Sequence, residues 1–547
     1  MHTPTCASGF PSTLVIVVLL ATLRAGPWAF VTAEAAAPDT KSEVATKAVQ
    51  LSLEQCVILA LQNNLDVRIE RLSPLIREEE VRREAGAFLA PRMNVEVSTD
   101  RSQRPAGSVL AGAQVLESQN LDANTGVSLR SPTGGIVSLD FRNKRFETNS
   151  AFQLFDPQYT SELALTLTHP LLKNFGTGVN GVRIKVAQNN LQISKHQLEV
   201  VVASLIVDVQ QTYWDLALGV HDLAARRRSL QVAQHLQKRT AELVTRGRLP
   251  TLATLQAKTA VIEREIEVVA GENAFADAQA RLRALLNLDK VLALTDYTLV
   301  PIDIPRMDTQ PVSVEAGLKS AMAKRPELFQ AKLDQENRVL GVRLARNQRL
   351  PELNLIGSIG LSGLSGHPTP NQFSTVTVDG VPVINLLPGG QSGSQFEGGY
   401  GHSLGELFSG DFLSYKVGVN IQIPLGNQLA RSEMAKARLE VEKSRLFVQT
   451  LEQKIALEVE TVARGINSRL KAVEGARSLR HLAERKLDMA QEGLDLGVSS
   501  VTDVLESQKN LSLAERDELK TITEYHKLLS LWEKSTGMAL ERFHIDL

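Results

Sequence analysis

Apolar residues recur at helical spacing over two very long segments of the chain. The first series is Leu198, Val202, Leu205, Val209, Tyr213, Leu216, Val220 and Leu223, and the second is Val448, Leu451, Ile455, Val459, Val462, Ile466, Leu470 and Val473. Their steps of three and four residues average close to 3.6, between a coiled-coil seam and a straight helix. The pattern predicts one long helix over 182–246 and a second over 431–495.

The positions of proline permit helices of this length, because proline breaks helix interiors. No proline lies between Pro170 and Pro250, and none follows Pro424. At 1.5 Å per residue each predicted helix is about 97 Å long. We expect each to turn sharply into a return helix, 251–287 and 500–537. A plain coiled-coil hairpin would show the same pattern, so the helices alone leave that alternative open.

Four other segments alternate between apolar and polar residues, as half-buried strands do. In the last of them the apolar positions are Val417, Val419, Ile421 and Ile423. We predict strands near 91–101, 160–169, 351–361 and 415–424, each about ten residues, the length of a tilted membrane strand. A soluble sheet over a core would alternate in the same way. Four strands cannot close a membrane barrel, so a membrane location requires several copies, and three copies give twelve strands.

Two long connections separate the paired strands. Residues 360–413 are rich in Gly, Ser, Pro and Asn, and residues 102–159 resemble them. Such connections are uncommon inside compact domains and fit the external loops of a membrane protein. Within the first connection, Gly134 and Gly135 stand between two alternating runs in Thr125–Asn143, a pattern consistent with an extra hairpin.

An internal duplication organises the chain. Leu51-Ser-Leu-Glu54 matches Val312-Ser-Val-Glu315, Pro91-Arg-Met-Asn-Val95 matches Pro351-Glu-Leu-Asn-Leu355, Leu165-Thr-Leu-Thr-His-Pro170 matches Val419-Asn-Ile-Gln-Ile-Pro424, and the segment from Gly247 to Leu255 matches that from Gly497 to Leu505. The order is preserved and the offset shrinks slowly, as a duplicated domain with small deletions would show. We therefore predict a first structural repeat over 51–300 and a second over 312–540.

The N-terminal segment has the pattern of an export signal. An apolar run over Thr13–Leu23 is too short to span a bilayer but suits a secretory signal. Ala33-Glu34-Ala35 and Ala35-Ala36-Ala37 are the candidate cleavage sites, although no Lys or Arg precedes the apolar run. We predict a signal peptide over 1–37.

Composition excludes several classes of function. The chain has 60 basic and 61 acidic side chains, and this balance gives no support to a nucleic-acid partner. It has two cysteines, Cys6 and Cys56, and Cys6 would leave with the signal, so a disulfide framework and a cysteine zinc site are not expected. No catalytic triad, metal-ligand spacing or phosphate-binding loop is present. We expect no cofactor, no metal and no enzymatic activity.

Several segments in this order resemble the TolC-type outer-membrane factors, the outer membrane efflux protein family. They are Leu51-Ser-Leu-Glu with Ala60-Leu-Gln-Asn-Asn64, Ala87-Phe-Leu-Ala-Pro91, Pro170-Leu-Leu-Lys-Asn-Phe-Gly176, Tyr213-Trp-Asp-Leu216 and Gly497 with Asp503-Val-Leu505. The resemblance covers roughly 50–540. It implies a homotrimer with a twelve-stranded β-barrel in the outer membrane of a Gram-negative bacterium, above a long α-helical barrel in the periplasm. It also implies a passive exit duct for efflux or type I secretion that works with a periplasmic adaptor and an inner-membrane pump or ABC transporter.

The resemblance assigns roles to the helix tips. The turns at Gly247 and Leu249 and at Gly497 and Val498 would meet the adaptor protein. Helix–turn–helix chemistry alone would also place glycine there, with Gly247 and Gly497 in the left-handed region and Pro250 near the start of the next helix.

Asp503 and Glu506 share one helix face and match carboxylates that ring the periplasmic entrance of the family. Ser500 and Asp503 also fit a capping box, with Asp in place of Glu. Ala253, Ser499 and Leu494 replace an acid, an arginine and a tyrosine of the family, so its polar entrance links are not expected here.

One alternative from another class is a periplasmic coiled-coil adaptor, or a structural protein without a pore. Adaptors usually contain one helical hairpin and lack two matched pairs of membrane-like strands, whereas this chain carries the pattern twice. In the strand over 415–424, we predict that Val417, Val419, Ile421 and Ile423 face lipid.

Overall fold

A computed structural model describes residues 47–107, 113–150, 153–247, 250–288, 297–303, 311–369, 371–388, 394–496 and 498–545. The predicted signal peptide, 1–37, lies outside the described residues. In the described part of the chain, no helix is both long and apolar enough to cross a bilayer.

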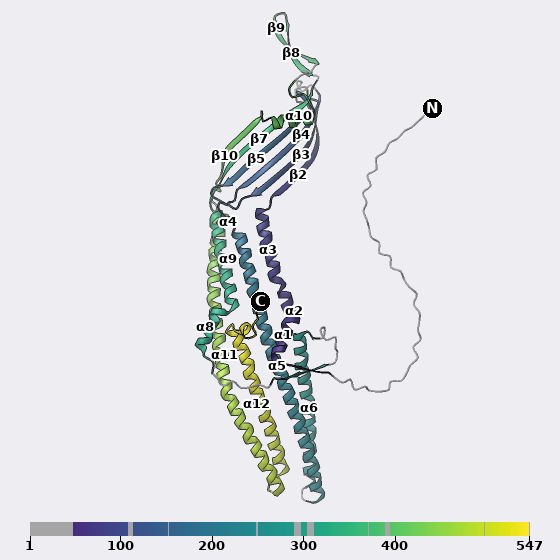
Figure 1. Ribbon diagram of the computed structural model, residues 1–547, viewed down its shortest axis with the longest axis vertical. Helices are drawn as coiled ribbons and strands as arrows, with labels where there is room; N and C mark the ends of the chain where they lie inside the picture. Colours follow the sequence, from purple (N-terminus) through teal and green to yellow (C-terminus); the bar gives the residue numbers. More distant parts are fainter. Residues whose placement is uncertain are drawn as a thin grey trace, which may run out of the picture. The chain divides into compact units, whose positions relative to one another are not determined.

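Two very long helices dominate the described structure. Helix α5 (Val182–Thr245) has 64 residues and α11 (Gln428–Leu496) has 69. Each turns into a shorter partner, α6 (Thr251–Leu286) and α12 (Val501–Ser535), which gives two antiparallel hairpins (Figure 1). Helix α12 also packs along α5, so the four helices lie in the lateral order α11, α12, α5, α6.

A second set of helices lies between the hairpins and the large sheet. Helix α9 (Pro326–Gln348) packs between α5 and α11, and α3 (Leu72–Leu89) packs on the other side of α5. The lateral order at this level is therefore α11, α9, α5, α3. The shorter helices are α1 (Leu53–Asn63), α2 (Leu65–Glu70), α4 (Thr177–Asn180), α8 (Val314–Lys324), α10 (Tyr400–Ser409) and α13 (Ala539–Arg542).

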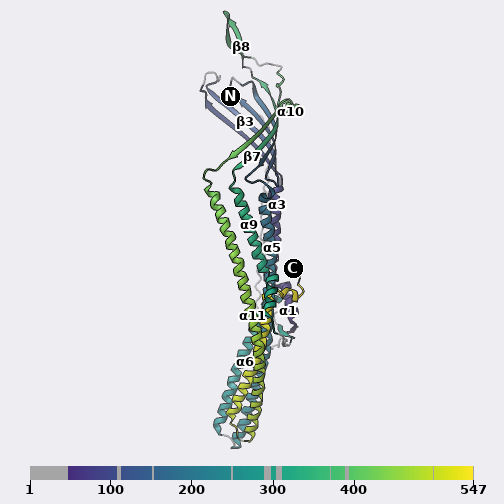
Figure 2. The same ribbon diagram turned by 90° about the vertical axis from the view of Figure 1, so that its left-hand side faces the viewer.

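An antiparallel sheet of six strands lies beyond the ends of α3, α5, α9 and α11 (Figures 1 and 2). Its strands are β2 (Arg92–Pro105), β3 (Val115–Arg130), β4 (Ile136–Thr148), β5 (Phe155–Pro170), β7 (Glu352–Pro368) and β10 (Leu413–Gln422). They pair in the order β10, β7, β5, β4, β3, β2. Two small sheets lie outside it, the parallel pair β1 (Lys47–Leu51) with β6 (Tyr297–Pro301) and the hairpin β8 (Asn371–Val378) with β9 (Val381–Pro388).

The sheet corrects the prediction of four strands per chain. Strands β3 and β4 lie within 102–159, where the sequence predicted mainly an external loop, so the sheet has six strands and not four. The hairpin suspected within Thr125–Asn143 is real and longer than its pattern indicated. The other predicted loop, 360–413, is wrong in part, because it contains the end of β7, the β8–β9 hairpin and α10.

The strand prediction fell short because only part of each strand alternates in hydrophobicity. On β4 the alternation of Val137, Leu139 and Phe141 gives way to Asn143 and Arg145 on the same face. The end of a strand that carries polar residues on both faces shows no hydrophobic alternation. The alternation therefore marks only part of the strand and underestimates its length.

Helix α10 packs on β7 and β5 over Gly363, a position of the sheet without a side chain. A Cβ atom on Gly363 would lie 2.0 Å from the carbonyl oxygen of Ser403. The Ser403 hydroxyl is 3.0 Å from that of Ser161 on β5, and both side chains are buried. This close approach requires glycine at position 363.

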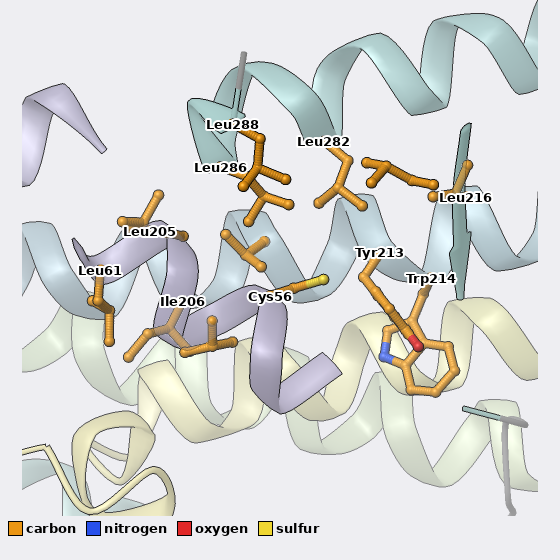
Figure 3. Close-up of a cluster of buried hydrophobic side chains, with 14 of the residues drawn as sticks. Cys56, Leu61, Leu205, Ile206, Tyr213, Trp214, Leu216, Leu282, Leu286 and Leu288 are labelled. Carbon is orange, nitrogen blue, oxygen red and sulfur yellow. The ribbon is translucent and has the colours of Figure 1, made fainter. Parts of the chain in front are cut away.

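A core of apolar side chains surrounds the middle of α5. Figure 3 shows Cys56 of α1 in one cluster with Ile206 and Tyr213 of α5 and Leu282 of α6 (Figure 3). The hydroxyl group of Tyr213 donates to Asp303 Oδ2 at 2.9 Å, which satisfies the polar end of a buried ring. Burial raises the pKa of the Cys56 thiol to about 12, so it remains a neutral core side chain.

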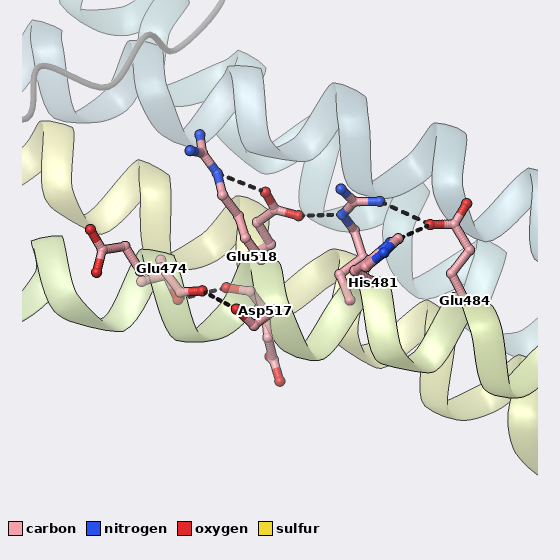
Figure 4. Close-up of polar contacts among 9 residues, drawn as sticks. Glu474, His481, Glu484, Asp517 and Glu518 are labelled. Carbon is pink, nitrogen blue, oxygen red and sulfur yellow. Dashed lines mark hydrogen bonds and ion pairs between the residues drawn. The ribbon is translucent and has the colours of Figure 1, made fainter.

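Ion pairs hold the second hairpin together along its exposed side. Glu518 of α12 accepts from Arg480 Nε at 2.6 Å and from Arg477 Nε at 3.3 Å, both on α11 (Figure 4). Because both arginines are partly exposed, we expect a modest contribution to stability from each pair.

Candidate functional site

The large sheet has one apolar and one polar face across all six strands. Residues paired in a ladder point to the same face. The register joins Tyr415, Ile359, Leu165, Leu139 and Val127 in one row, with Met93 at its end. We call this side the apolar face, and it consists of Met93, Val95, Val97, Val127, Leu129, Val137, Leu139, Phe141, Leu163, Leu165, Leu167, Leu353, Leu355, Ile359, Leu361, Leu413, Tyr415, Val417, Val419 and Ile421.

Three of the four residues predicted to face lipid belong to this apolar face. Val417, Val419 and Ile421 are exposed on β10, and Ile423 is exposed just after the strand ends. Their orientation toward lipid stays a prediction, because the structure contains a single chain.

The opposite side, the polar face, carries charged and amide side chains. Arg142 on β4 lies 3.6 Å from Glu162 on β5, and Asn120 on β3 donates to Asp100 on β2 at 3.0 Å. Charged groups on one side and apolar groups on the other would suit a wall between water and lipid.

The first hairpin turn has the predicted glycine chemistry. Arg246 ends α5 as its C-cap, and Gly247 follows with φ of 70°, in the left-handed region that favours glycine. Pro250 is the N-cap of α6, one residue before the helix begins. This confirms the backbone prediction for Gly247, whereas Leu249 lies outside the described residues.

At the second turn, apolar side chains project into solvent. Leu496 is 80% exposed and Val498 is 81% exposed. Leu252 and Leu255 at the start of α6 are also exposed, so both tips carry exposed apolar side chains. Of these four residues, the sequence analysis named only Val498 as a docking residue. The other three could have been found as well, because each is an apolar residue next to a predicted turn. Gly497 lies outside the described residues.

Asp503 forms the predicted capping box at the start of α12. The Ser500 hydroxyl oxygen accepts from the Asp503 amide at 3.2 Å, and Asp503 Oδ2 accepts from the Ser500 amide at 2.8 Å. The hydrogen bonds from Ser500 hold the pKa of the Asp503 carboxyl below its usual range. Asp503 and Glu506 are both exposed, on the side of α12 away from its buried residues.

An apolar cluster joins the two hairpins near their tips. Its buried members are Leu236 of α5, Ala253 of α6, and Val501 and Val504 of α12, with Leu494 of α11 packed against them. In the sequence, Ala253 and Leu494 were noted only as apolar residues that replace an acid and a tyrosine of the TolC-type family. The structure shows that both contribute to a hydrophobic contact in the tip region.

Further along, ion pairs connect the hairpins. Arg516 of α12 lies 2.8 Å from Asp222 of α5, and Lys527 of α12 contacts Asp215 of α5. The hairpins are therefore held by an apolar contact near the tips and by charge pairs farther from them.

Both lateral sides of the described chain expose apolar stripes, which sequence reasoning missed. On the side of α3 the exposed residues are Leu65, Ile69, Leu72 and Ile76, and on α6 they are Ile262, Ile266 and Val269. On the opposite side, α11 exposes Leu439, Leu446, Leu482 and Met489. The helical spacing of these residues could be seen in the sequence. The sequence did not show which helices lie at the two lateral sides.

The described residues contain no group of three or more His, Cys, Asp or Glu side chains that could hold a metal ion.

The model of the outer membrane efflux protein family matches residues 317–527, within the second repeat. No curated protein matches the chain. Among solved structures, a membrane protein from Pseudomonas aeruginosa is 17% identical with a TM-score of 0.61, covering 89% of this chain and 93% of that one.

Two outer-membrane proteins have the same fold. The CmeC outer membrane channel of Campylobacter jejuni is 16% identical with a TM-score of 0.60, covering 89% of this chain and 86% of its own. The outer membrane protein VceC of Vibrio cholerae is 14% identical with a TM-score of 0.59, covering 89% and 96%. At these identities the structural likeness establishes the fold.

Proposed function

We propose that this chain is a TolC-type efflux protein of the outer membrane and that three copies form a passive exit duct across the periplasm and outer membrane. The duct would receive substrate from an inner-membrane pump or ABC transporter through a periplasmic adaptor. No catalytic step and no cofactor is assigned to it. The observation that carries this proposal is the six-stranded sheet with one continuous apolar face and two open edges.

The open edges favour assembly. Strands β10 and β2 form the two edges of the sheet and run in opposite directions, so β2 of one copy can pair with β10 of the next. Unpaired backbone groups are not tolerated in lipid, so a sheet in the membrane must close on itself. Closure between copies removes both edges.

The apolar stripes support the same arrangement below the sheet. One stripe follows α2, α3 and α6, and the other follows α11, so each lies on the same side as an edge strand. Exposed apolar side chains that recur along one side of a chain mark an interaction site. We assign both stripes to contacts with neighbouring copies of this chain.

The exposed apolar tips are the proposed docking site for the adaptor. Val498 and Gly247, with Leu249 and Gly497 beside them, would meet its helices, and Leu252, Leu255 and Leu496 extend that surface. The alternative, that the chain is itself a coiled-coil adaptor, does not account for the six-stranded sheet.

The first prediction is the oligomeric state in detergent. Light scattering with correction for bound detergent should give the mass of three chains, because a single chain leaves two sheet edges and two apolar stripes uncovered. A folded monomer would contradict the proposed duct, and a different number of copies would contradict the trimer alone.

The second prediction concerns ion selectivity at the entrance. With α12 facing the lumen, Asp503 and Glu506 of three copies would form a ring of carboxylates, which focuses a negative potential and attracts cations. Replacing both residues by Ala should lower the cation-to-anion permeability ratio several-fold in planar bilayers. The capping hydrogen bonds from Ser500 both go to Oδ2 of Asp503. The same carboxylate can therefore cap the helix and contribute its charge to the ring.

A matched control separates charge from helix stability. Ser500→Ala removes the capping hydroxyl and costs about 1 kcal/mol of stability, yet it keeps both carboxylates. Selectivity should be unchanged in this variant. If the double variant also keeps full cation selectivity, the carboxylates do not line the entrance.

A further inference from the structure

Four of the six sheet strands connect directly to the helical layer, and two do not. Strand β10 leads into α11, α9 leads into β7, β5 leads through α4 into α5, and α3 leads into β2. Strands β3 and β4 form a hairpin inserted between β2 and β5, and no helix continues from either (Figure 1). The lateral order of the helices, α11, α9, α5, α3, is repeated above by β10, β7, β5 and β2 with this hairpin added.

The inserted hairpin is fully integrated into the sheet. Strand β3 pairs with β2 from Arg92↔Ser128 to Pro105↔Val115, and β4 pairs with β5 from Ile136↔Thr168 to Phe146↔Gln158. These ladders are as long as those among the other strands, which excludes a loosely attached loop.

The turn of the hairpin is anchored on the segment between β5 and α5. The amide of Gly176 donates to the Thr133 carbonyl at 2.9 Å, and the Thr133 hydroxyl lies 3.0 Å from His169 Nε2. A Cβ atom on Gly134 would lie 2.3 Å from the carbonyl oxygen of Asn174, and φ at Gly134 is 100°. This turn is therefore fixed at the junction of sheet and helices.

The two faces of the hairpin continue those of the sheet. Val127 and Leu139 belong to the apolar face, whereas Asp122, Asp140 and Arg142 belong to the polar face. An extracellular loop or a plug inside the lumen would have no need of an apolar side in this register. The hairpin has the chemistry of a wall between lipid and water.

Two extra strands also match the width of the sheet to that of the helices. Strands about 4.8 Å apart and tilted by about 40° each occupy roughly 6 Å of circumference, so six cover roughly 38 Å. Four helices packed about 9.5 Å apart cover roughly the same arc. Four strands would cover only about 25 Å, and the tube would narrow at the membrane.

We infer that the β3–β4 hairpin widens the membrane section of the duct, so that three copies close an eighteen-stranded wall in place of a twelve-stranded one. This rests on the proposed trimeric duct. Barrel diameter grows about linearly with strand number, from roughly 24 Å to roughly 36 Å between opposing backbones. Inward side chains remove about 10 Å of this. A wall of this width admits solutes about 20 Å across, which a twelve-stranded wall of the same tilt excludes.

Polymer exclusion in planar bilayers tests the inference. Polyethylene glycols of graded size, added on the extracellular side, lower the conductance only when they enter the membrane section. In a variant lacking residues 109–150, β2 can pair directly with β5. Met93 then stays in the same row of paired residues as Leu165, as in the full chain. The exclusion diameter of this variant should be about half that of the full chain. The matched control lacks residues 371–388, the β8–β9 hairpin outside the large sheet, and should keep the exclusion diameter of the full chain.

Cysteine labelling gives a second measurement that does not depend on the deletion variant folding. Leu139→Cys and Asp140→Cys are adjacent on β4 and lie on opposite faces. In lipid vesicles, a water-soluble thiol reagent should react with Asp140→Cys and lower the conductance, and it should leave Leu139→Cys unmodified. Cys56 is buried and contributes little background.

Each result decides between defined alternatives. An unchanged exclusion diameter in the variant lacking 109–150, or equal labelling at both cysteines, would overturn the wider wall and leave the duct intact. Absence of any channel from the full chain would instead contradict the proposed function itself.

Discussion

Leu165→Arg is expected to prevent most of the protein from reaching a stable assembled state in the membrane. Leu165 lies near the middle of β5, within the row that crosses the apolar face from Tyr415 to Met93. An arginine on the lipid side of a membrane strand costs roughly 2–4 kcal/mol near the bilayer midplane. In a trimer that cost is incurred three times, so the amount of membrane-inserted trimer should fall at least tenfold.

Thr166→Arg is the matched control for this charge. Thr166 is the next residue on the same strand, pairs with Ser138 and Ser358, and lies on the polar face. The same substitution there meets water, so assembly should remain near that of the unmodified chain. The measurement is trimer recovered from membranes, together with the free energy of unfolding in lipid vesicles. Equal losses at both positions would show that the faces are assigned wrongly.

Arg325→Met should cause a large loss of stability, because it removes one partner of a buried ion pair. Arg325 precedes α9 with its side chain 7% exposed, and it donates from Nη2 to Glu327 at 2.8 Å and from Nη1 to Glu458 of α11 at 2.6 Å. Removing one partner of a buried pair leaves a poorly solvated carboxylate and breaks a link between helices. Because Glu458 is partly exposed, we expect about 3 kcal/mol, at the low end for such pairs.

Arg338→Met removes the same kind of charge from an exposed pair within α9. Arg338 lies 3.4 Å from Asp334, with both side chains 47% exposed. Surface pairs of this kind contribute about 0–1 kcal/mol. Urea unfolding of both variants at pH 7 should therefore separate them clearly. Similar stabilities would mean that the Arg325 link contributes little.

The pH dependence of the Arg325 link gives an independent check. Burial alone would raise the pKa of Glu327, but hydrogen bonds from Arg325 and its charge lower it overall. A carboxyl with a depressed folded-state pKa stabilises above its unfolded value, about 4.3, and this contribution is lost as the pH falls through the folded value. The stability difference between Arg325→Met and the unmodified chain should therefore shrink below about pH 4.

The helical part of the fold was largely predictable because its signals are local. The absence of proline and the steps between Leu198 and Leu223 indicated α5, and the structure has a helix over Val182–Thr245. The capping box at Ser500 and the left-handed glycine at 247 were also readable, since each depends on a few neighbouring residues. Outward orientation of Val417, Val419 and Ile421 and lumen exposure of Asp503 and Glu506 depend on other copies and stay predictions.

The strand count was not predictable by the same reasoning. The alternating apolar runs are short, Val127 and Leu129 on β3 and Val137, Leu139 and Phe141 on β4, and the rest of each strand is polar, so the pattern did not reveal two full-length strands. The role of Ala253 was hidden for a related reason. A small residue in a helix indicates nothing about its partner, and only the approach of α12 to α6 places Val501 and Val504 beside it.

The sequence by itself determined the duplicated hairpins, the helix turns and the amphipathic character of the strands. These follow from backbone propensity, hydrophobic period and capping, which act within a few residues along the chain. The tertiary structure decided that the sheet has six strands, which helices form its two sides, and that an apolar cluster joins the hairpin tips. These depend on which distant surfaces bury each other, and burial is a property of the whole packed chain that no local pattern contains.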